Sequence, residues 1–404
     1  MPDQALAGLR VVEYAQGFSG PFCTKILADY GADVIKVESP TGDWIRRKAP
    51  FVRDDPHLEK SGPFLYLNTN KRGATLNLAT TTGRDLFRLL LNRANALVLA
   101  DPPINPESAG IGASQLRKEF PSLVVLDMTS FGRTGPYATW KACDLLTFHM
   151  SGTAWITPDT VDDPPSQPPL QGPGHLAELF AGLTAAGLLM TYLVSQNVRG
   201  GHVIDLSAWD AVLHNMAREV AQFALDGSVP GRLPQSLYGF GGGGLLPCKD
   251  GSAKIYFTEH HFWIAMAELI GRPELASDER YRDRAARAKN WKSLEPVVVG
   301  FCKQYGKKEL ASMCQAKGIP AAPVNTVGEL WEEPQVKSRR LIMDVQHPAA
   351  GHVKLPTAPF RLEETPCAPP APAPVLGQHN TAVWCDMLGI PRADLVAFRE
   401  SGVI

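Results

Sequence analysis

One carboxylate stands alone in the most apolar part of the chain. Glu178 is the only charged residue in the 19-residue stretch from Leu176 to Val194, which has the composition of a buried core helix. A glutamate side chain is ionised at pH 7, with a reference pKa of about 4.3, and the dipole of a helix stabilises an anion in its first turn. Two interpretations stay open here: Glu178 is a reactive carboxylate, or it only favours the start of a helix.

A second candidate site is the turn Gln16–Ser19, which follows a predicted strand and precedes Gly20-Pro21. Backbone N–H groups at such a strand-to-helix turn favour anionic ligands. Glu38, about 20 residues further on, stands where a dinucleotide fold carries its ribose-binding acid. The turn lacks the Gly-x-Gly-x-x-Gly pattern, however, because only Gly17 and Gly20 are present. We therefore expect either an anion-binding turn or a plain tight turn, and no NAD.

Composition excludes several classes of protein. The 404 residues include 40 Lys+Arg and 41 Asp+Glu, a formal net charge of −1, which argues against a nucleic-acid-binding or membrane-binding protein. The seven cysteines are spread without a Cys-x-x-Cys pair, so we expect reduced thiols in a cytoplasmic protein, with no metal site. No secretory signal is expected at the N-terminus. The uncharged apolar run from Leu179 to Val194 has 16 residues, which is short for a membrane span, and we expect a buried core helix there.

The elements that must position these residues alternate as in a parallel α/β fold. Val-rich and Leu-rich segments alternate with short helical patterns over the first 130 residues, which favours a mostly parallel sheet covered on both faces. Strands are predicted over residues 9–14, 32–38, 96–100, 123–128 and 202–206, and helices over 20–29, 83–92, 176–194 and 209–225. After the glycine run at 241–244 the pattern becomes smaller and mixed. We predict domains at 1–225 (large, α/β) and 226–325 (small, α+β), followed by a C-terminal segment, 326–404.

Several motifs together resemble one family along essentially the whole chain. They include Leu67-Asn-Thr-Asn70-Lys71-Arg72, Phe131-Gly-Arg-Thr-Gly135-Pro136-Tyr137, Gly318-Ile-Pro-Ala-Ala-Pro323 and Gly377-Gln378-His379-Asn380, beside the opening segment Leu9–Glu38. The chain resembles the family III CoA-transferases, the CaiB/BaiF group that contains formyl-CoA and carnitine CoA-transferases. The resemblance implies a Rossmann-like large domain to which the C-terminal segment returns. It also implies an interlocked homodimer whose stiff Pro-rich linkers join the two domains.

The resemblance also implies the ligands and their contacts. Acyl-CoA and a small carboxylic acid would be substrates, with no permanently bound cofactor. Because CoA is polyanionic, placed cations are expected to hold it. By similarity the CoA contacts are Gln16, Gly17, Phe18, Ser19, Lys71, Arg72 and Lys141. Gly241, Gly242, Gly243 and Gly244 match a glycine-rich lid that shields the intermediates from water. Many relatives carry arginine where this chain has Ser39, so its grip on the nucleotide end of CoA is expected to differ.

The catalytic position departs from the family pattern. Relatives read Leu-Ala-Asp-x-x-x-Gly, whereas this chain reads Leu176-Ala177-Glu178-Leu-Phe-Ala-Gly182. By resemblance, Glu178 is the nucleophile that attacks the donor thioester and then carries CoA as an enzyme thioester. One alternative is a non-catalytic CoA-binding subunit that pairs with an Asp-bearing paralogue. An acyl-CoA racemase is a further alternative, but the segment before Asp144 has Cys143 where the racemase pattern has histidine.

Overall fold

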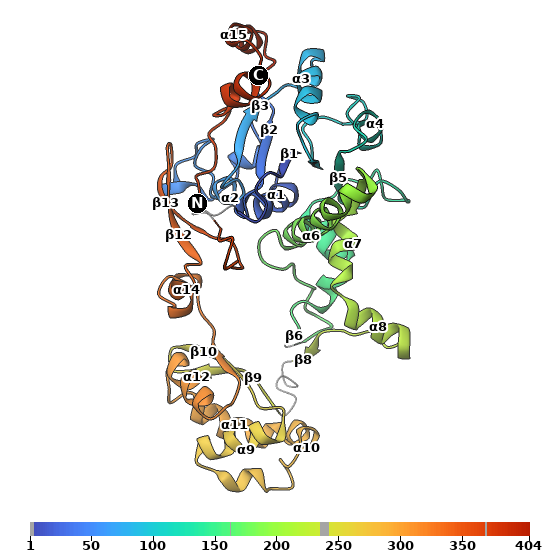
Figure 1. The fold of residues 1–404 in the computed structure, drawn as a ribbon. Coiled ribbons are helices and arrows are strands. Elements are labelled where there is room, and N and C mark those ends of the chain that lie inside the picture. The colour runs from blue at the N-terminus through green and yellow to red at the C-terminus, as the bar shows by residue number, and fades with distance from the viewer. Residues whose placement is uncertain (1–3, 162, 235–241, 368–369) are drawn as a thin grey trace. The chain divides into compact units, whose positions relative to one another are not determined.

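The computed structural model describes residues 4–161, 163–234, 242–367 and 370–404 (Figure 1). The chain forms two compact units. The larger unit contains residues 1–154, 171–229 and 336–404, and the smaller one contains residues 155–170 and 230–335. The small domain predicted at 226–325 falls in the smaller unit for most of its length, and this unit also takes up the segment 155–170 ahead of the apolar helix.

A six-stranded sheet forms the centre of the larger unit. Its order is β3-β2-β1-β4-β5-β7, and every neighbouring pair is parallel. The strands are β1 (Arg10–Ala15), β2 (Asp33–Glu38), β3 (Arg72–Thr75), β4 (Ala96–Ala100), β5 (Val124–Thr129) and β7 (Val203–Ser207). The expected parallel α/β architecture is therefore confirmed. The strand order reverses between β1 and β4, which is the place where open parallel sheets bind ligands, beyond the carboxyl ends of the strands.

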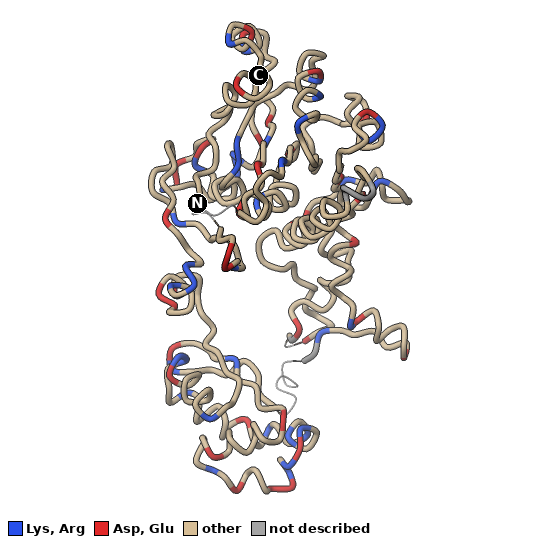
Figure 2. Tube along the Cα trace, in the orientation of Figure 1, with Lys and Arg blue, Asp and Glu red and all other residues tan. Residues whose placement is uncertain are grey.

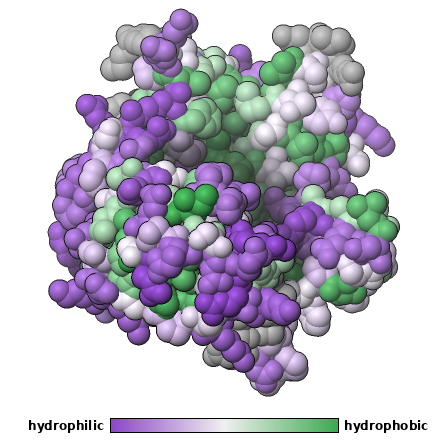
Figure 3. Space-filling model, turned by 90° about the horizontal axis from the view of Figure 1, so that it is seen from below, coloured by the Kyte–Doolittle hydropathy of each residue, from purple (hydrophilic) through white to green (hydrophobic). Residues whose placement is uncertain are grey.

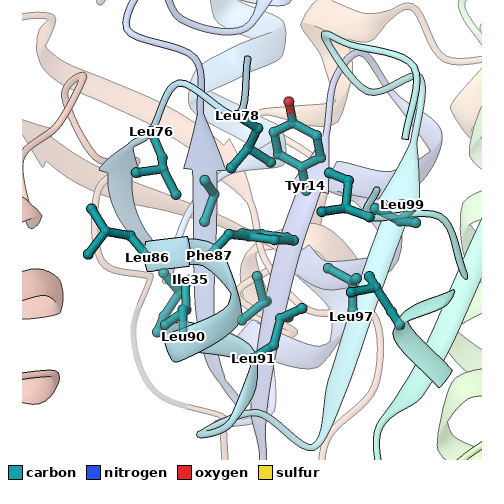
Figure 4. Close-up of a cluster of buried hydrophobic side chains, with 14 of the residues drawn as sticks. Tyr14, Ile35, Leu76, Leu78, Leu86, Phe87, Leu90, Leu91, Leu97 and Leu99 are labelled. Carbon is teal, nitrogen blue, oxygen red and sulfur yellow. The ribbon is translucent and has the colours of Figure 1, made fainter. Parts of the chain in front are cut away.

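Helices cover both faces of this sheet, because successive strand residues point to opposite sides. On one face Tyr14, Ile35 and Leu97 pack with Phe87 and Leu90 of α3 (Thr81–Leu91) (Figure 4). The other face is covered by α1 (Ser19–Asp29) and α6 (Leu176–Arg199). The remaining helices of the larger unit are α2 (Gly62–Leu67), α4 (Ala113–Glu119), α5 (Asp144–Met150), α7 (Ala208–His214) and α8 (Ala217–Asp226), with the short helices η1 (Trp44–Arg47) and η2 (Val52–Asp54). The short helix η3 (Thr153–Ile156) spans the point in the chain where the larger unit ends and the smaller one begins.

By length and composition α6 is long and apolar enough to cross a membrane over Leu176–Ser195. Its small side chains Ala181, Ala185 and Ala186 are buried. This face packs into the cluster that covers the sheet, so one face of α6 belongs to the core of the larger unit.

The C-terminal segment returns to the large sheet. The backbone N–H of Gly73 donates to His379 Nδ1 at 3.0 Å, and that of Thr75 donates to Asn380 Oδ1 at 2.8 Å. Trp384 is fully buried under the sheet, in the same cluster as α3. The elements of this segment are α14 (Pro334–Ser338), the antiparallel pair β12 (Ile342–His347) and β13 (Gly351–Pro356), the π-helix η6 (Thr381–Met387) and α15 (Arg392–Glu400).

The smaller unit has its own hydrophobic core around Trp263 and Phe257. Its elements are β6 (Thr160–Val161), β8 (Leu233–Pro234), β9 (Gly243–Cys248), β10 (Gly251–Tyr256), β11 (Ala321–Pro323), α9 (His260–Ile270), η5 (Pro273–Ala276), α10 (Arg284–Lys289), α11 (Trp291–Cys302), α12 (Lys307–Ala316) and α13 (Val327–Leu330). Lys and Arg are interspersed with Asp and Glu along the chain (Figure 2). The molecular face in Figure 3 is mostly hydrophilic, with hydrophobic side chains scattered between polar ones.

Candidate active site

The predicted turn and Glu178 meet at the carboxyl edge of the large sheet. β1 ends at Ala15, and α1 begins at Ser19 after the turn. Gly182 of α6 lies against this start, because a Cβ added to it would stand 2.6 Å from the Ser19 carbonyl oxygen. Only glycine permits so close an approach. The first turn of α6, which carries Glu178, is thereby brought to the turn that follows β1.

His175 connects the two segments. Its Nδ1 lies 2.8 Å from Glu178 Oε2, and each of these side chains is 28% exposed. The imidazole also stacks on the Phe18 ring, with centroids 3.5 Å apart and planes 13° apart. Stacking fixes the plane of the imidazole, and the hydrogen bond then fixes one oxygen of the carboxylate while the group stays accessible to solvent.

Asp144, the first residue of α5, supports the start of α6. The backbone N–H of Glu178 donates to Asp144 Oδ1 at 3.0 Å, and Gln171 Nε2 donates to Oδ2 at 2.7 Å. Asp144 is only 4% exposed. The Asp144 carboxylate therefore accepts a hydrogen bond from an N–H group that has no partner within the helix. It also places a negative charge beside Glu178.

Burial raises the pKa of Glu178 above its usual range, and the charges of Asp144 and Asp101 raise it further. The charge and hydrogen bond of His175 lower this pKa and so oppose the increase. A carboxylate in such surroundings is more basic than an exposed one and is a candidate reactive group. Of the causes acting on this pKa, the contact with His175 is the one that favours the ionised form of Glu178.

Asp101 and Trp44 close the site beyond the end of β4. Trp44 Nε1 donates to Asp101 Oδ2 at 3.1 Å, and the Trp44 ring lies 6.2 Å from that of Phe18. Asp101 has φ of 42°, an uncommon backbone conformation for a non-glycine residue that is often found at functional sites.

Asp144, His175 and Glu178 place ligand-type atoms within 4.8 Å of one another. Protein hydrogen bonds account for this grouping. Both oxygens of Asp144 accept hydrogen bonds, and Glu178 Oε2 is bonded to His175. The trio is therefore explained as a positioned carboxylate with its supports.

Comparisons with known proteins identify the family. A sequence profile described as CoA-transferase family III matches residues 6–380. The chain belongs to the family III CoA-transferases. It is 30% identical to the succinyl-CoA–D-citramalate CoA-transferase of Chloroflexus aurantiacus over 407 residues, covering 100% of this chain and 99% of the relative. It is 29% identical to the beta subunit of the succinyl-CoA–L-malate CoA-transferase of the same organism over 405 residues, covering 99% of this chain and 98% of the relative. A crystal structure of a CAIB/BAIF family protein from Brucella suis is similar, with a TM-score of 0.83 and 28% sequence identity. The match covers 95% of this chain and 99% of the Brucella suis chain.

Family membership confirms the resemblance found in the motifs and makes this chain an enzyme of the CoA-transferase class. Of the predicted contacts, the structure gathers Gln16, Gly17, Phe18 and Ser19 with Glu178. Some of their backbone donors already have partners: the N–H of Gln16 donates to the Ala100 carbonyl at 3.0 Å, and that of Gly17 to Asp43 Oδ1 at 3.2 Å. The side chains of Gln16 and Ser19 are partly exposed.

Lys71 of this CoA-transferase is placed inside the protein and not at its surface. It is 3% exposed, and its Nζ donates to Glu13 Oε2 at 2.8 Å, to the Pro21 carbonyl at 2.8 Å and to Asn68 Oδ1 at 3.0 Å. Burial lowers the pKa of Lys71 to about 8, against the opposing charge of Glu13. All three of its donors are used, so the structure gives Lys71 a structural role beneath the turn.

The other two predicted cations, Arg72 and Lys141, differ in their surroundings: Arg72 is paired with a carboxylate and Lys141 is exposed. Arg72 forms a fork with Asp33, with Nε 2.8 Å from Oδ1 and Nη2 2.5 Å from Oδ2. It starts β3 and therefore lies at the amino edge of the sheet, opposite Glu178. Lys141 is exposed in the loop before α5, and no ion pair is recorded for it in the described parts of the chain. Of the three predicted cations Lys71, Arg72 and Lys141, Lys141 is the one that the structure leaves exposed in a loop that follows the carboxyl end of a sheet strand.

The predicted lid falls partly outside the described residues, since Gly241 is not described. Gly243 and Gly244 belong to β9 and pair with Tyr256 and Ile255 of β10. A Cβ on Gly243 would stand 2.2 Å from the Ile255 carbonyl oxygen, and one on Gly242 would stand 2.4 Å from the Thr258 Cα. These glycines are required for close packing within the smaller unit, and their proposed lid function stays a prediction.

Sequence reasoning did not identify Asp101 and Trp44 as supporting residues, and it named Asp144 only in the comparison with the racemase pattern. Asp144 lies 34 residues before Glu178 in the chain and Asp101 follows a different strand. One signal was present: Asp101 directly follows a fully buried strand, and parallel strands bring such end positions to one edge.

Proposed function

We propose that this chain transfers CoA from an acyl-CoA donor to a carboxylic acid acceptor, with Glu178 as the nucleophile. The observation that carries the proposal is the placement of the Glu178 carboxylate. It lies in the first turn of α6 at the carboxyl edge of the sheet, held by His175 and partly exposed. A carboxylate so placed is oriented for attack on a bound thioester.

The proposed reaction proceeds through acyl exchange at this carboxylate. A Glu178 oxygen attacks the thioester carbonyl, the C–S bond breaks, and CoA leaves as a thiolate. The thiolate then attacks the glutamyl carbonyl of the mixed anhydride, which releases the donor acid and leaves a glutamyl–CoA thioester. The acceptor carboxylate attacks this thioester and again expels the thiolate. Attack of the thiolate on the acyl carbonyl of the second anhydride forms the new acyl-CoA and regenerates the carboxylate.

A polar pocket at the same edge supports the placement of CoA. The pocket, of about 520 Å³, is lined by Pro40, Thr75, Arg392 and Arg399 among others. Thr75 ends β3 and Pro40 follows β2, so the pocket lies one to two strand spacings from the turn after β1, at about 4.8 Å per strand. We propose that Arg392 and Arg399 bind the phosphates of CoA and take over the role of the arginine that many relatives have in place of Ser39.

Replacement of Arg399 tests this placement. Arg399→Ala is expected to raise the KM for acyl-CoA about tenfold through loss of a charge-assisted phosphate contact, with kcat little changed. Arg93→Ala, which removes an exposed arginine after α3, serves as the control. An unchanged KM in Arg399→Ala would place the phosphates elsewhere.

The activity itself is tested with the purified chain alone. Succinyl-CoA is the first donor to try, because both relatives described above are named for it. We expect CoA transfer to a panel of carboxylic acids, and its loss in Glu178→Gln. The alternative of a non-catalytic subunit draws support from the relative named as a beta subunit. Activity that arises only after an Asp-bearing paralogue is added would favour that alternative.

The assembly and the compartment are part of the proposal. We propose an interlocked homodimer, since the chain passes between its two units four times, at 154/155, 170/171, 229/230 and 335/336. All seven cysteines are free thiols in the structure, which suits the cytoplasm, where the enzyme is proposed to act. Sedimentation at several concentrations is expected to give a dimer without a detectable monomer, and a dissociating or monomeric chain would contradict interlocking.

A further inference from the structure

A second pocket lies at the opposite edge of the large sheet. Its volume is about 620 Å³, and it is bounded by α1, by Asn70 ahead of β3, and by the C-terminal segments 338–343 and 357–367. Asn70 precedes the first residue of β3, and Asp29 is the last residue of α1, which runs back along the sheet. Both positions mark the amino edge, whereas Glu178 and the pocket at Arg399 lie at the carboxyl edge.

The floor of this pocket is a fully bonded polar network. Lys25 Nζ donates to Asp29 Oδ2 at 2.7 Å and to Thr69 Oγ1 at 2.9 Å, and Asn70 Nδ2 donates to Asp29 Oδ1 at 2.7 Å. Lys25 and Asp29 are almost completely buried. These hydrogen bonds hold the floor of the pocket in place. The charges of Lys25 and Asp29 cancel, so the floor contributes no net charge.

The wall is strongly basic. Arg339, Arg340 and Arg361 line the pocket. Among the described residues of the wall, Glu363 is the only acidic one. Within the described parts of the chain no ion pair is recorded for any of the three arginines, and Arg361 Nη2 donates only to the Ser338 carbonyl, at 3.2 Å. Three guanidinium groups around one cavity give a concentrated positive charge in a protein whose net charge is −1. Guanidinium forks match phosphate oxygens.

Arg340 has a backbone conformation that favours glycine. Its φ is 48°, and it follows the end of α14, where a left-handed residue usually terminates a helix. Its carbonyl oxygen accepts a hydrogen bond from Thr357 Oγ1 at 3.0 Å, which ties the two wall segments together. A non-glycine residue in this conformation has a higher backbone energy. Within the described residues, no side-chain hydrogen bond or ion pair of Arg340 offsets this energy.

An aromatic ring stands beside the arginines. The Phe360 ring stacks on Tyr30, with centroids 4.0 Å apart and planes 12° apart, and is 49% exposed. Its backbone is fixed by Tyr30, whose hydroxyl donates to the Phe360 carbonyl at 3.0 Å and accepts from the Phe360 N–H at 3.2 Å. A fixed, half-exposed ring offers a stacking surface for a planar group.

We propose that this amino-edge pocket binds a nucleoside diphosphate, with the phosphates on Arg339, Arg340 and Arg361 and the base on Phe360. The volume suits a small-molecule site. The same chemistry is present in free ADP and in the nucleotide end of CoA, so the test must distinguish these two sources. The pocket lies at the sheet edge away from Glu178, and binding there is independent of the proposed chemistry.

Arg340→Gly is the sharpest variant, because glycine adopts a φ of 48° without strain. The guanidinium is removed while the turn is kept, so the variant is expected to melt at or above the wild-type temperature. Calorimetric titration of the full chain with ADP is expected to show binding to the wild type and about tenfold weaker binding to Arg340→Gly. Arg361→Ala is expected to weaken ADP to a similar extent, and the control Arg93→Ala is expected to leave it unchanged.

A second titration is made with CoA present in saturating amount. ADP binding that persists and still depends on Arg340 supports a separate nucleotide site. ADP binding that CoA abolishes, with CoA itself weakened in Arg340→Gly, supports the same pocket with CoA as the source. Equal ADP affinity of wild type and Arg340→Gly, or no ADP binding by the wild type, would overturn the proposal.

Discussion

At the scale of single residues, three neighbours act on the pKa of Glu178, the proposed nucleophile. Burial and the charges of Asp144 and Asp101 raise its pKa, and His175 lowers it. The nucleophile in the proposed reaction is the ionised form, so a folded-state pKa above the usual value means that activity is lost on acidification at a higher pH than for an ordinary glutamate. We therefore propose that His175 is a positioning residue whose contact favours the ionised form of Glu178.

His175→Ala tests this role. The variant loses the one partner that lowers the pKa of Glu178, so the acidic limb of kcat/KM is expected to move to higher pH, with much of the activity recovered on the alkaline side. His149→Ala, which removes an exposed histidine on α5, is the control and should leave the profile unchanged. A limb that stays in place, or moves to lower pH, in His175→Ala would contradict the assigned role.

At the scale of elements, the site depends on how closely α6 approaches α1. Glycine at 182 permits the contact with the Ser19 carbonyl, and Glu178 stands one helical turn before it. The position of the proposed nucleophile is therefore set by a backbone contact between two helices and not by Glu178 alone. We therefore expect the small residue at 182 to matter for chemistry at the first turn of α6.

Gly182→Ala is expected to push α6 away from α1 and lower kcat about 100-fold, because a shift of about 1 Å in a nucleophile has this effect. Gly187→Ala in the same helix has open space around the added methyl and is the matched control. In Gly187→Ala, helix α6 is expected to be stabilised by up to about 1 kcal/mol without loss of activity. Equal kcat values in the two variants would show that the close approach is not needed.

Most elements could be predicted from local patterns, and β4 has the predicted bounds 96–100. The helix predicted over 209–225 is instead two helices, α7 ending at His214 and α8 starting at Ala217. The break carries no glycine or proline to signal it. Met216 at the break is buried, and its sulfur would be 3.3 Å from a Cβ on Gly152. Such a long-range contact has no trace in hydrophobic periodicity.

In the site, too, residues with local signals could be predicted and residues whose roles depend on long-range contacts could not. Glu178 and the turn after β1 could be found from sequence because their signals are local, a lone charge and a strand-to-helix turn. Lys71 could not be assigned from its motif, because its partner Glu13 lies 58 residues away on another strand. Burial and ion pairing across strands decide whether a lysine binds a ligand or supports the fold.

At the scale of the whole molecule, Glu13, Lys36 and Lys71 form a buried ionic network under the turn. Lys36 Nζ lies 2.8 Å from Glu13 Oε1 and 2.9 Å from Asp43 Oδ2. The charges of Lys36 and Lys71 outweigh burial and lower the pKa of Glu13 to about 2. Because this folded-state pKa is below the unfolded value, the stabilisation is present above about pH 4.5 and is lost as pH falls toward about 2.

Lys71→Met and Lys141→Met separate structural from ligand-binding lysines. Lys71→Met leaves Glu13 buried with one partner fewer and is expected to lower the free energy of unfolding by about 3 kcal/mol. Lys141→Met is expected to keep stability and raise the KM for acyl-CoA. Urea unfolding and steady-state kinetics of both variants check this pair, and the opposite pattern would return Lys71 to the list of CoA contacts.

The central claim is that Glu178 becomes covalently attached to CoA during turnover. The purified chain is incubated with acyl-CoA, treated with hydroxylamine or borohydride, and digested for mass spectrometry. The account predicts a hydroxamate or a reduced side chain at Glu178 in the wild type, and none in Glu178→Gln. Transfer activity of the pure chain without any modification at Glu178, or with modification at another carboxylate such as Asp144, would contradict it.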